Sequence, residues 1–209
     1  RKSVAFQNAK KIFQDAGYAM SAMVLDASLC GDPQKRKRIF VYGELEGVDN
    51  QLIPYIMGKQ SNRPMTVRDY FGDRLGFDHY YRHPRSYKRR GIFSVDEPSP
   101  TIRGVNRPLP DGYPGHSGDT TPISTSVRAL TTKERSLIQT FPDTYILSGT
   151  KTNVEQIIGN AVPVKLAEFV AECILNMHED RGREDYKYPE IAESDQLTLF
   201  EQRATYSSV

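Results

Sequence analysis

The stretch that decides the fold is "LDASLCGDPQKRKRIFVYG", residues 25–43. Within it, four consecutive cationic side chains, Lys35 to Arg38, come directly before the apolar run Ile39 to Tyr42. That run is rich in β-forming residues and predicts a strand, and the Gly-Asp-Pro sequence ahead of the charges predicts a turn. A second apolar run, Met20 to Leu25, predicts another strand. The charges therefore lie between two predicted strands, where a solvated turn and a phosphate-binding patch are both compatible with them.

Side chains alternate between the two faces of an extended segment. Gln34, Arg36 and Arg38 should therefore point to one side, and Lys35 and Lys37 to the other. One face can then line a pocket while the other meets solvent or a nucleic acid.

Length and composition limit the class of protein. The chain has 209 residues and a formal net charge of +2, which suits one large domain or two small ones. No apolar run approaches the roughly 20 residues that a membrane span needs, and no signal peptide is visible. Two cysteines are too few for a disulfide framework, and the four histidines lack a metal-ligand spacing. We expect a cytoplasmic protein with no metal site, and we expect that Arg1 is not the true start of the gene product.

Helical periodicity marks both ends of the chain. Apolar residues recur at helical spacing over Val4 to Ala16, and Gly17 should end that helix. A second helix is predicted over Leu130 to Ile138, before Phe141-Pro142, and a third over Val164 to Met177.

Changes in composition divide the chain into four parts. Residues 1–48 hold a helix and two strands, residues 49–127 are rich in Pro, Gly, Arg and Tyr, residues 128–180 return to helices, and residues 181–209 form a tail. Between Arg63 and Arg107, nine arginines and one lysine stand against five acids, with seven aromatic residues among them. Such a segment favours nucleic-acid binding, and a basic loop without that function is the alternative.

Three blocks, in order along the chain, resemble the DNA cytosine-5 methyltransferases. The first is Pro-Gln-x-Arg-x-Arg before a strand, at residues 33–38. The second is "RALTTKERSLIQTFPDTY", residues 128–145, which also contains a predicted helix capping box at Thr131 and Glu134. The third is "IIGNAVPVKLAEFVA", residues 157–171, with Ala161 where the family more often has serine. "TVRDYFGD" and "DEPSPTIRGVNRP" in the middle region also look family-like, so the resemblance covers residues 1 to about 178.

The resemblance implies an α/β fold. The chain would form the C-terminal edge of a Rossmann-like S-adenosylmethionine-dependent methyltransferase sheet, plus a small, irregular, mostly β target-recognition domain. The predicted divisions are 1–48 for the end of the catalytic domain, 49–127 for target recognition, 128–180 for helices that return to the catalytic domain, and 181–209 for the tail.

The resemblance also implies roles for individual residues. Arg38 would reach the O2 atom of a flipped cytosine, with Arg36 and Gln34 supporting the pocket. A guanidinium cannot lose its proton at ordinary pH, so it can stabilise negative charge at O2 without any adjustment of its pKa. Asn160, with Ala161 and Val162, would border the pocket for the cofactor S-adenosylmethionine.

The middle region would select the sequence of double-stranded DNA. Arginine suits both guanine edges and phosphates, and phosphate contacts usually outnumber base contacts. The candidate DNA contacts are Arg82, Arg85, Lys88, Arg89, Arg90, Thr101 and Arg103.

The chain does not contain several features that the family's chemistry needs. It has no Pro-Cys nucleophile, no Glu-Asn-Val sequence and no glycine-rich cofactor turn near its start. Cys30 follows a leucine, and Cys173 lies on the apolar stripe of a predicted helix. We therefore expect the C-terminal part of such an enzyme, with the N-terminal catalytic half in the same or a separate chain. The strands near Met23 and Phe40 would then leave sheet edges for a partner to cover.

A short peptide in the tail, "QLTLF", resembles the pentapeptide by which bacterial proteins dock on the replication sliding clamp. The residues concerned are Gln196, Leu197, Leu199 and Phe200. Clamp binding would place the protein at the nucleoid and tie methylation to newly replicated DNA.

Three functions follow from these observations. The first is the C-terminal part of a bacterial cytosine-5 DNA methyltransferase of a restriction-modification system, which flips its target base. The second is a non-catalytic DNA-recognition subunit. The third is a catalytically inactive DNA-binding homologue. The sequence upstream of Arg1 distinguishes them by the presence or absence of the nucleophile.

Overall fold

The computed structural model describes residues 4–183 and 185–187. The fold is mixed α/β and consists of two compact units. The first unit comprises the described residues of 1–26, 37–60 and 168–209, and the second comprises residues 27–36 and 61–167. Residues 188–209 lie outside the described part, and with them the predicted clamp peptide.

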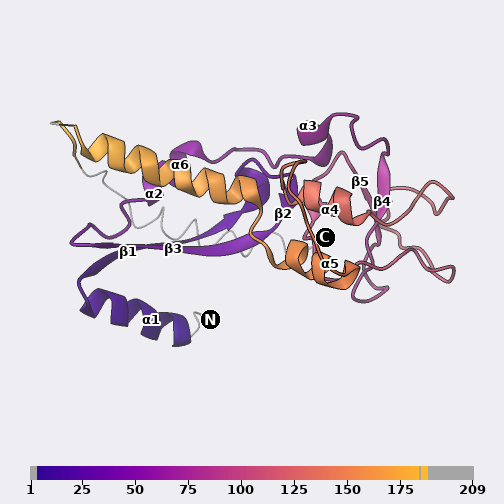
Figure 1. Ribbon diagram of the computed structural model, residues 1–209, viewed down its shortest axis with the longest axis horizontal. Coiled ribbons are helices and arrows are strands. Elements are labelled where there is room, and N and C mark those ends of the chain that lie inside the picture. Colours follow the sequence, from indigo (N-terminus) through magenta and orange to yellow (C-terminus); the bar gives the residue numbers. More distant parts are fainter. Residues whose placement is uncertain (1–3, 184, 188–209) are drawn as a thin grey trace. The chain divides into compact units, whose positions relative to one another are not determined.

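The first unit is built on two long antiparallel strands. Helix α1 (Val4–Asp15) leads through Gly17, whose φ is 86°, into β1 (Tyr18–Asp26). β1 pairs along its whole length with β3 (Lys37–Leu45), as Figure 1 shows. The predictions of the first helix, its glycine stop and both strands are confirmed.

One face of this two-stranded sheet is apolar and exposed. On β3 the side chains of Ile39, Val41 and Leu45 are 56%, 44% and 57% exposed. Alternate residues such as Phe40 and Tyr42 point to the other face and are partly buried. Three apolar side chains of α1 are also exposed, namely Val4, Ile12 and Phe13. Among the described residues, β1 and β3 pair with no other strand.

Two helices complete the first unit. Helix α2 (Ile53–Lys59) lies next to the part of α6 (Val164–Arg181) that belongs to this unit. The Cys173 Sγ atom donates a hydrogen bond to the Tyr55 carbonyl at 3.6 Å, and Lys59 forms an ion pair with Glu172. The buried apolar residues of this unit include Met20, Met23, Leu25, Leu52, Ile53, Ile56, Phe169, Cys173 and Met177.

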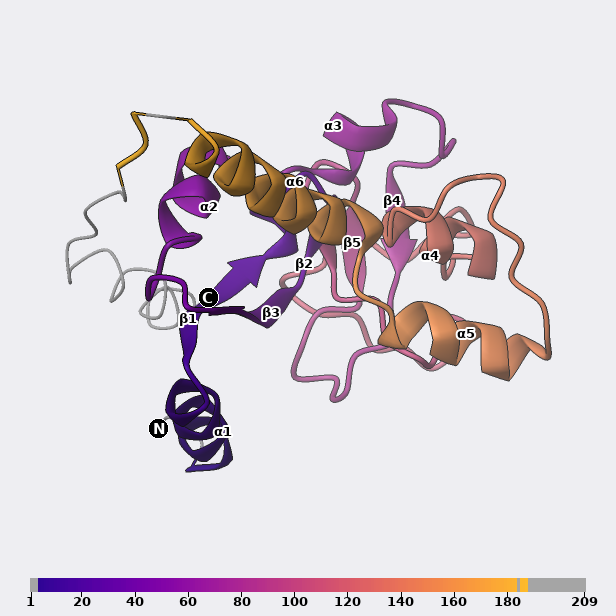
Figure 2. The same ribbon diagram turned by 60° about the vertical axis from the view of Figure 1, so that its left-hand side comes forward.

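The second unit combines short strands with short helices, as Figure 2 shows. β2 (Gln34–Lys35) follows the single-turn 3-10 helix Ala27–Leu29 and pairs in parallel with β6 (Ser99–Pro100). β4 (His79–Tyr81) and β5 (Ile92–Ser94) form an antiparallel pair. The helices are α3 (Val67–Phe71), α4 (Thr132–Ile138) and α5 (Lys151–Asn160).

The two predicted C-terminal helices are present with nearly the expected bounds. The capping box of α4 is confirmed, because Thr131 and Glu134 each bond the other's backbone N–H. Helix α5 was not predicted, and its last turn contains Gly159 and Asn160 of the third sequence block. Its apolar residues are too few to give a strong periodic signal.

The middle of the chain departs from the expectation of a mostly β region at residues 49–127. That range contains helices α2 and α3, and its strands are only two or three residues long. The unit boundaries differ too, because residues 128–167 pack with residues 61–127 in one core. That core contains Val67, Phe71, Tyr80, Phe93, Val95, Ile102, Leu130, Ile138, Val154 and Ile158.

Candidate nucleic-acid interface

The side-chain amides of Gln34 and Gln139 are buried and form a hydrogen bond with each other. The Gln34 Oε1 atom accepts a hydrogen bond from the Ile102 N–H at 2.9 Å, and its Nε2 atom donates to Gln139 Oε1 at 3.1 Å. Gln139 in turn donates to the Ile158 carbonyl at 2.5 Å. Gln34 thus links β2 to the segment after β6 and to the end of α5.

Arg36 completes the same junction. Its side chain is almost fully buried, and its two Nη atoms donate to the carbonyls of Ile102, at 2.9 Å, and Gly159, at 3.0 Å. A buried guanidinium needs acceptors for its donors, and here backbone carbonyls accept from both Nη atoms. Arg36 therefore ties the loop after β6 to the last turn of α5, and its supporting role at a base pocket stays a prediction. Gln34 and Arg36 are buried and Lys35 is exposed, so the predicted alternation holds over residues 34–36.

Arg38 is arranged differently. It lies near the start of β3 in the first unit, opposite Leu25, and donates one hydrogen bond to the Lys37 carbonyl at 2.8 Å. The guanidinium makes no other hydrogen bond or ion pair within the described part of the chain. Of the two arginines of the first sequence block, Arg36 is held by the protein, and Arg38 keeps donors that a bound group can use.

Apart from Arg36, the arginines of the second unit fall into two sets. Six of them form ion pairs with acids: Arg63, Arg68, Arg74, Arg90, Arg128 and Arg135. Arg68 alone contacts three carboxylates, and Arg135 forms a buried pair with Glu155 at 2.5 Å. Five others have no acidic partner among the described residues: Arg82, Arg85, Arg89, Arg103 and Arg107. The second set leaves a local excess of positive charge.

Burial and, after it, this excess of positive charge lower the pKa values of side chains in the cluster. Burial, together with the nearby charge of Arg103, lowers the pKa of Arg82 to about 10. Burial, then the charges of Arg85 and Arg89, lowers the pKa of Arg103. The pKa of His83 is lowered as well, first by burial and then by Arg107 and Arg103. Each of these positive charges is destabilised by its neighbours and would be stabilised by a bound anion. The cluster is therefore suited to binding phosphate.

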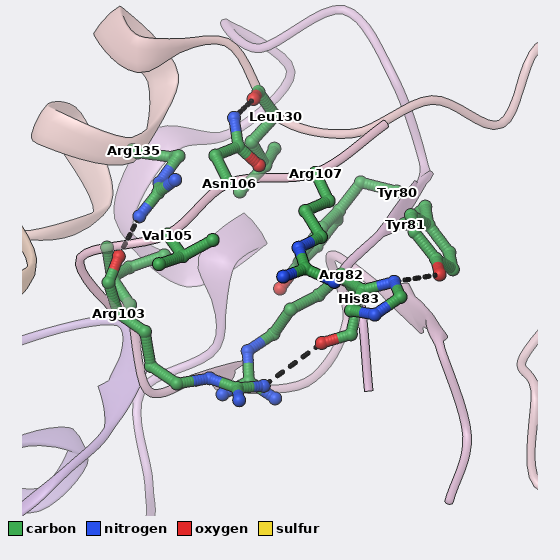
Figure 3. Close-up of a pocket in the computed structure, with 11 residues that line it drawn as sticks. Tyr80, Tyr81, Arg82, His83, Arg103, Val105, Asn106, Arg107, Leu130 and Arg135 are labelled. Atoms are coloured by element: carbon green, nitrogen blue, oxygen red, sulfur yellow. Dashed lines mark hydrogen bonds between the residues drawn. The ribbon is translucent and has the colours of Figure 1, made fainter. Parts of the chain in front are cut away.

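A small pocket of about 30 Å³, shown in Figure 3, is lined by Arg82, Arg103 and Arg107 of this set. Arg82 donates to the Thr101 carbonyl at 2.9 Å, and Arg103 donates to the His83 carbonyl at 3.0 Å. The His83 ring lies 3.0 Å from the Tyr81 hydroxyl. The lining residues are Tyr80, Tyr81, Arg82, His83, Ile102, Arg103, Val105, Asn106, Arg107, Leu130 and Arg135.

The structure brings only some of the predicted DNA contacts together. Arg82 and Arg103 line the pocket, and Arg85, Lys88 and Arg89 are exposed on the loop between β4 and β5. The Thr101 hydroxyl donates to the Lys35 carbonyl at 2.9 Å, so it already has a structural role.

Arg90 does not belong with this group. It forms a two-point ion pair with Glu97 and lies over the Phe93 ring, 4.4 Å from its centroid. Its guanidinium is engaged within the protein, and we omit it from the proposed DNA contacts. Arg107, which sequence reasoning missed, takes its place in the pocket. Only the spatial pairing of acids with arginines distinguishes these two residues.

The candidate cofactor residues follow at the end of α5. Gly159 is buried, whereas Asn160 and Val162 are exposed and Ala161 is half-buried. A Cβ added to Gly159 would overlap the backbone of Arg103 and come within 2.5 Å of the Gly104 Cα atom. The last turn of α5 therefore packs directly against the loop that contains Arg103.

Comparison with known proteins decides the family. The profile described as C-5 cytosine-specific DNA methylase matches residues 1–176. The chain belongs to this family.

Two relatives of this methylase chain are more than half identical to it. The Type II methyltransferase M.HindV of Haemophilus influenzae is 55% identical over 181 residues, which cover 86% of this chain and 60% of the relative. The Type II methyltransferase M.HgiDI of Herpetosiphon aurantiacus is 55% identical over 174 residues, which cover 83% of this chain and 56% of the relative. The methylase chain thus spans less than two thirds of the length of these relatives.

A solved structure shares the fold of the methylase chain. The S. pombe Dnmt2 methyltransferase superposes with a TM-score of 0.54 at 15% sequence identity, and the match covers 87% of this chain and 65% of that one. This likeness supports the mixed α/β methyltransferase fold.

Neither cysteine of the methylase chain is placed for nucleophilic attack. Cys30 and Cys173 are both buried. Burial raises the pKa of the Cys173 thiol to about 11, which keeps it protonated near neutral pH. No helix in the described ranges is long and apolar enough to cross a membrane.

Proposed function

We propose that this chain is the DNA-recognition part of a cytosine-5 DNA methyltransferase, which methylates C5 of a flipped cytosine within a specific duplex sequence. The chain also supplies part of the base pocket and part of the cofactor pocket. The observation that supports this most strongly is the set of five arginines that have no acidic partner among the described residues, in a chain of the C-5 cytosine methylase family.

Duplex DNA is the partner that this charge distribution fits. Arg82, Arg103 and Arg107 converge on one pocket, and Arg85, Lys88 and Arg89 extend the positive surface along one loop. A row of cations suits the regular spacing of backbone phosphates, and each phosphate contact releases counterions on binding. The ion-paired arginines of the same unit, such as Arg74, have no comparable role.

Arg38 is the residue that acts on the target base. Attack on a cytosine ring pushes negative charge toward O2, and a guanidinium with spare donors can stabilise that charge. Arg36 cannot take this role because its donors already bind Ile102 and Gly159. Arg36 and Gln34 instead hold the loop at Ile102, and Arg36 also holds the last turn of α5.

The cofactor is S-adenosylmethionine, which supplies the methyl group when bound. The exposed Asn160 amide can donate to or accept from a polar group of the cofactor, and the exposed Val162 side chain can contact an apolar part of it. Ala161 lacks the hydroxyl that the family more often has at this position. The residues fit a border of the cofactor pocket, with its remaining walls in the N-terminal half.

That N-terminal half is also the proposed partner of the exposed apolar face. β1 and β3 would form the edge of a larger Rossmann-like sheet, and Ile39, Val41 and Leu45 would be covered by its helices. Relatives longer than this chain support this arrangement. Binding to the sliding clamp through the tail, and a location at the nucleoid, remain part of the proposal.

Methylation of cellular DNA tests the proposed function. Genomic DNA from cells that express the full gene is digested with methylation-sensitive nucleases, and 5-methylcytosine is mapped by bisulfite sequencing. We expect 5-methylcytosine within one recurring duplex sequence. A genome without new 5-methylcytosine would favour a recognition subunit or an inactive homologue.

A further inference from the structure

Val105 is an apolar side chain in the middle of the cationic pocket. It lies on the loop between Arg103 and Arg107, neither of which has an acidic partner in the described part of the chain, and it is 66% exposed. Figure 3 shows it among the charged side chains that line the pocket. Solvent exposure of a single valine is common, so the surroundings must decide whether it has a role.

The backbone on both sides of Val105 is firmly held. Arg36 and Gln34 bind the carbonyl and N–H of Ile102, and Arg135 donates to the Arg103 carbonyl. Asn106 donates to the Leu130 carbonyl at 2.7 Å.

Gly104, which directly precedes Val105, packs closely on α5. A Cβ at this glycine would lie 3.3 Å from the Gln156 Cα atom. The exposed valine is therefore presented by a rigid loop.

Charged and apolar side chains should contact different parts of the DNA, namely the phosphate backbone and the base edges. Phosphate oxygens bind the arginines, but they offer nothing to the two methyl groups of a valine. The apolar groups that duplex DNA presents to a protein in the major groove are the C5 edges of pyrimidines, above all the thymine methyl. A loop whose arginines bind the backbone would bring an apolar side chain between them toward the base edges.

We propose that Val105 is a specificity-determining residue that contacts the C5 edge of a pyrimidine in the recognised sequence. This inference rests on the proposed DNA-binding function and assigns different roles to Val105 and to the arginines beside it. Arg103 and Arg107 hold phosphates and set affinity for any duplex, and Val105 discriminates among base pairs at one position.

The test is selection from a duplex library randomised over the binding site, with the full-length protein. Val105→Ala removes both methyl groups from an exposed side chain, so its melting temperature should match that of the wild type. Ile146→Ala is the matched control, because Ile146 is 87% exposed and does not line the pocket. Arg107→Ala tests the phosphate role.

We expect Val105→Ala to lose about tenfold of its preference at one base-pair position, which is the scale of a single base contact. Ile146→Ala should retain the wild-type preference, and Arg107→Ala should weaken binding to all duplexes alike. An unchanged preference profile for Val105→Ala would overturn this inference while leaving the proposed function intact. Absence of DNA binding by the wild-type protein would instead overturn the proposed function, and the role of Val105 with it.

Discussion

Gly159 stands so close to Gly104 that it has no room for a side chain on the facing side. A Cβ at Gly159 would come within 2.5 Å of the Gly104 Cα atom, and a Cβ at Gly104 would lie 3.3 Å from the Gln156 Cα atom. Arg36 binds the Gly159 carbonyl from the same junction. The last turn of α5 and the loop of the cationic pocket are therefore in direct backbone contact at Gly159 and Gly104.

Gly159→Ala should destabilise the protein by about 3 kcal/mol, because backbone atoms cannot move aside as a flexible side chain can. Gly112→Ala is the control in the same unit, since a Cβ there would meet nothing within 4 Å. Chemical denaturation measures both free energies of unfolding. Equal stability of the two variants would show that the junction is looser than these contacts require.

The buried pair Arg135–Glu155 should be sensitive to the loss of one partner. Both side chains are 4% exposed, and Glu155 also accepts a hydrogen bond from Thr132 at 2.7 Å. Glu155→Gln leaves a buried guanidinium without its counter-charge, which costs about 3–5 kcal/mol. Arg63→Gln removes an exposed ion pair and should cost less than about 1 kcal/mol. Urea titration distinguishes these cases, and similar losses for both variants would contradict the expected effect of burial.

The sequence predicts the ends of the chain better than its middle. Val4–Asp15 and Val164–Arg181 have long apolar stripes, so helical periodicity finds both. The short helices Ile53–Lys59 and Val67–Phe71 extend over only two turns or fewer, which is too little for a periodic signal to emerge. Their formation depends on long-range packing, which a local pattern does not record.

The hydrogen-bond and ion-pair partners of the site residues likewise could not be predicted from the sequence. The family resemblance gave Arg36 and Arg38 different expected roles, but the partners of Arg36 become visible only when the fold brings Ile102 and Gly159 to it. The sequence likewise does not distinguish Arg90 from Arg107. One is neutralised by Glu97, and the other has no acid near it in the described residues.

Arg103→Gln should weaken DNA binding and reduce its salt dependence. Each phosphate contact contributes about 0.9 to the slope of log K against log salt concentration, so one lost contact lowers the slope by about that amount. Arg74→Gln is the control, because Arg74 is an exposed arginine paired with Asp143 at 2.7 Å. Fluorescence anisotropy at several salt concentrations gives the slopes. The same slope for Arg103→Gln and wild type would remove Arg103 from the phosphate contacts.

Asp32 should make stability depend on pH. Burial raises the pKa of this carboxyl to about 8, although the Thr140 hydroxyl and the charge of Arg36 act in the opposite direction. The folded state therefore holds a proton that the unfolded state releases near pH 4, and stability falls as pH rises from about 4 to 8.

Asp32→Asn cannot ionise, so its stability relative to the wild type should increase over that pH range. Free energies of unfolding at pH 5 and pH 8.5 measure the change. A difference between variant and wild type that is the same at both pH values would show that Asp32 does not titrate in this range.

The most direct test of the account is the single-turnover methylation rate of the full-length Arg38→Lys variant. Lysine keeps the positive charge but lacks the planar fork of donors, so stabilisation of charge at cytosine O2 should weaken. We predict a fall of about 100-fold or more in the rate of methyl transfer, with duplex affinity within about threefold of the wild type. A variant that methylates at the wild-type rate would contradict the assignment of Arg38 to the target base.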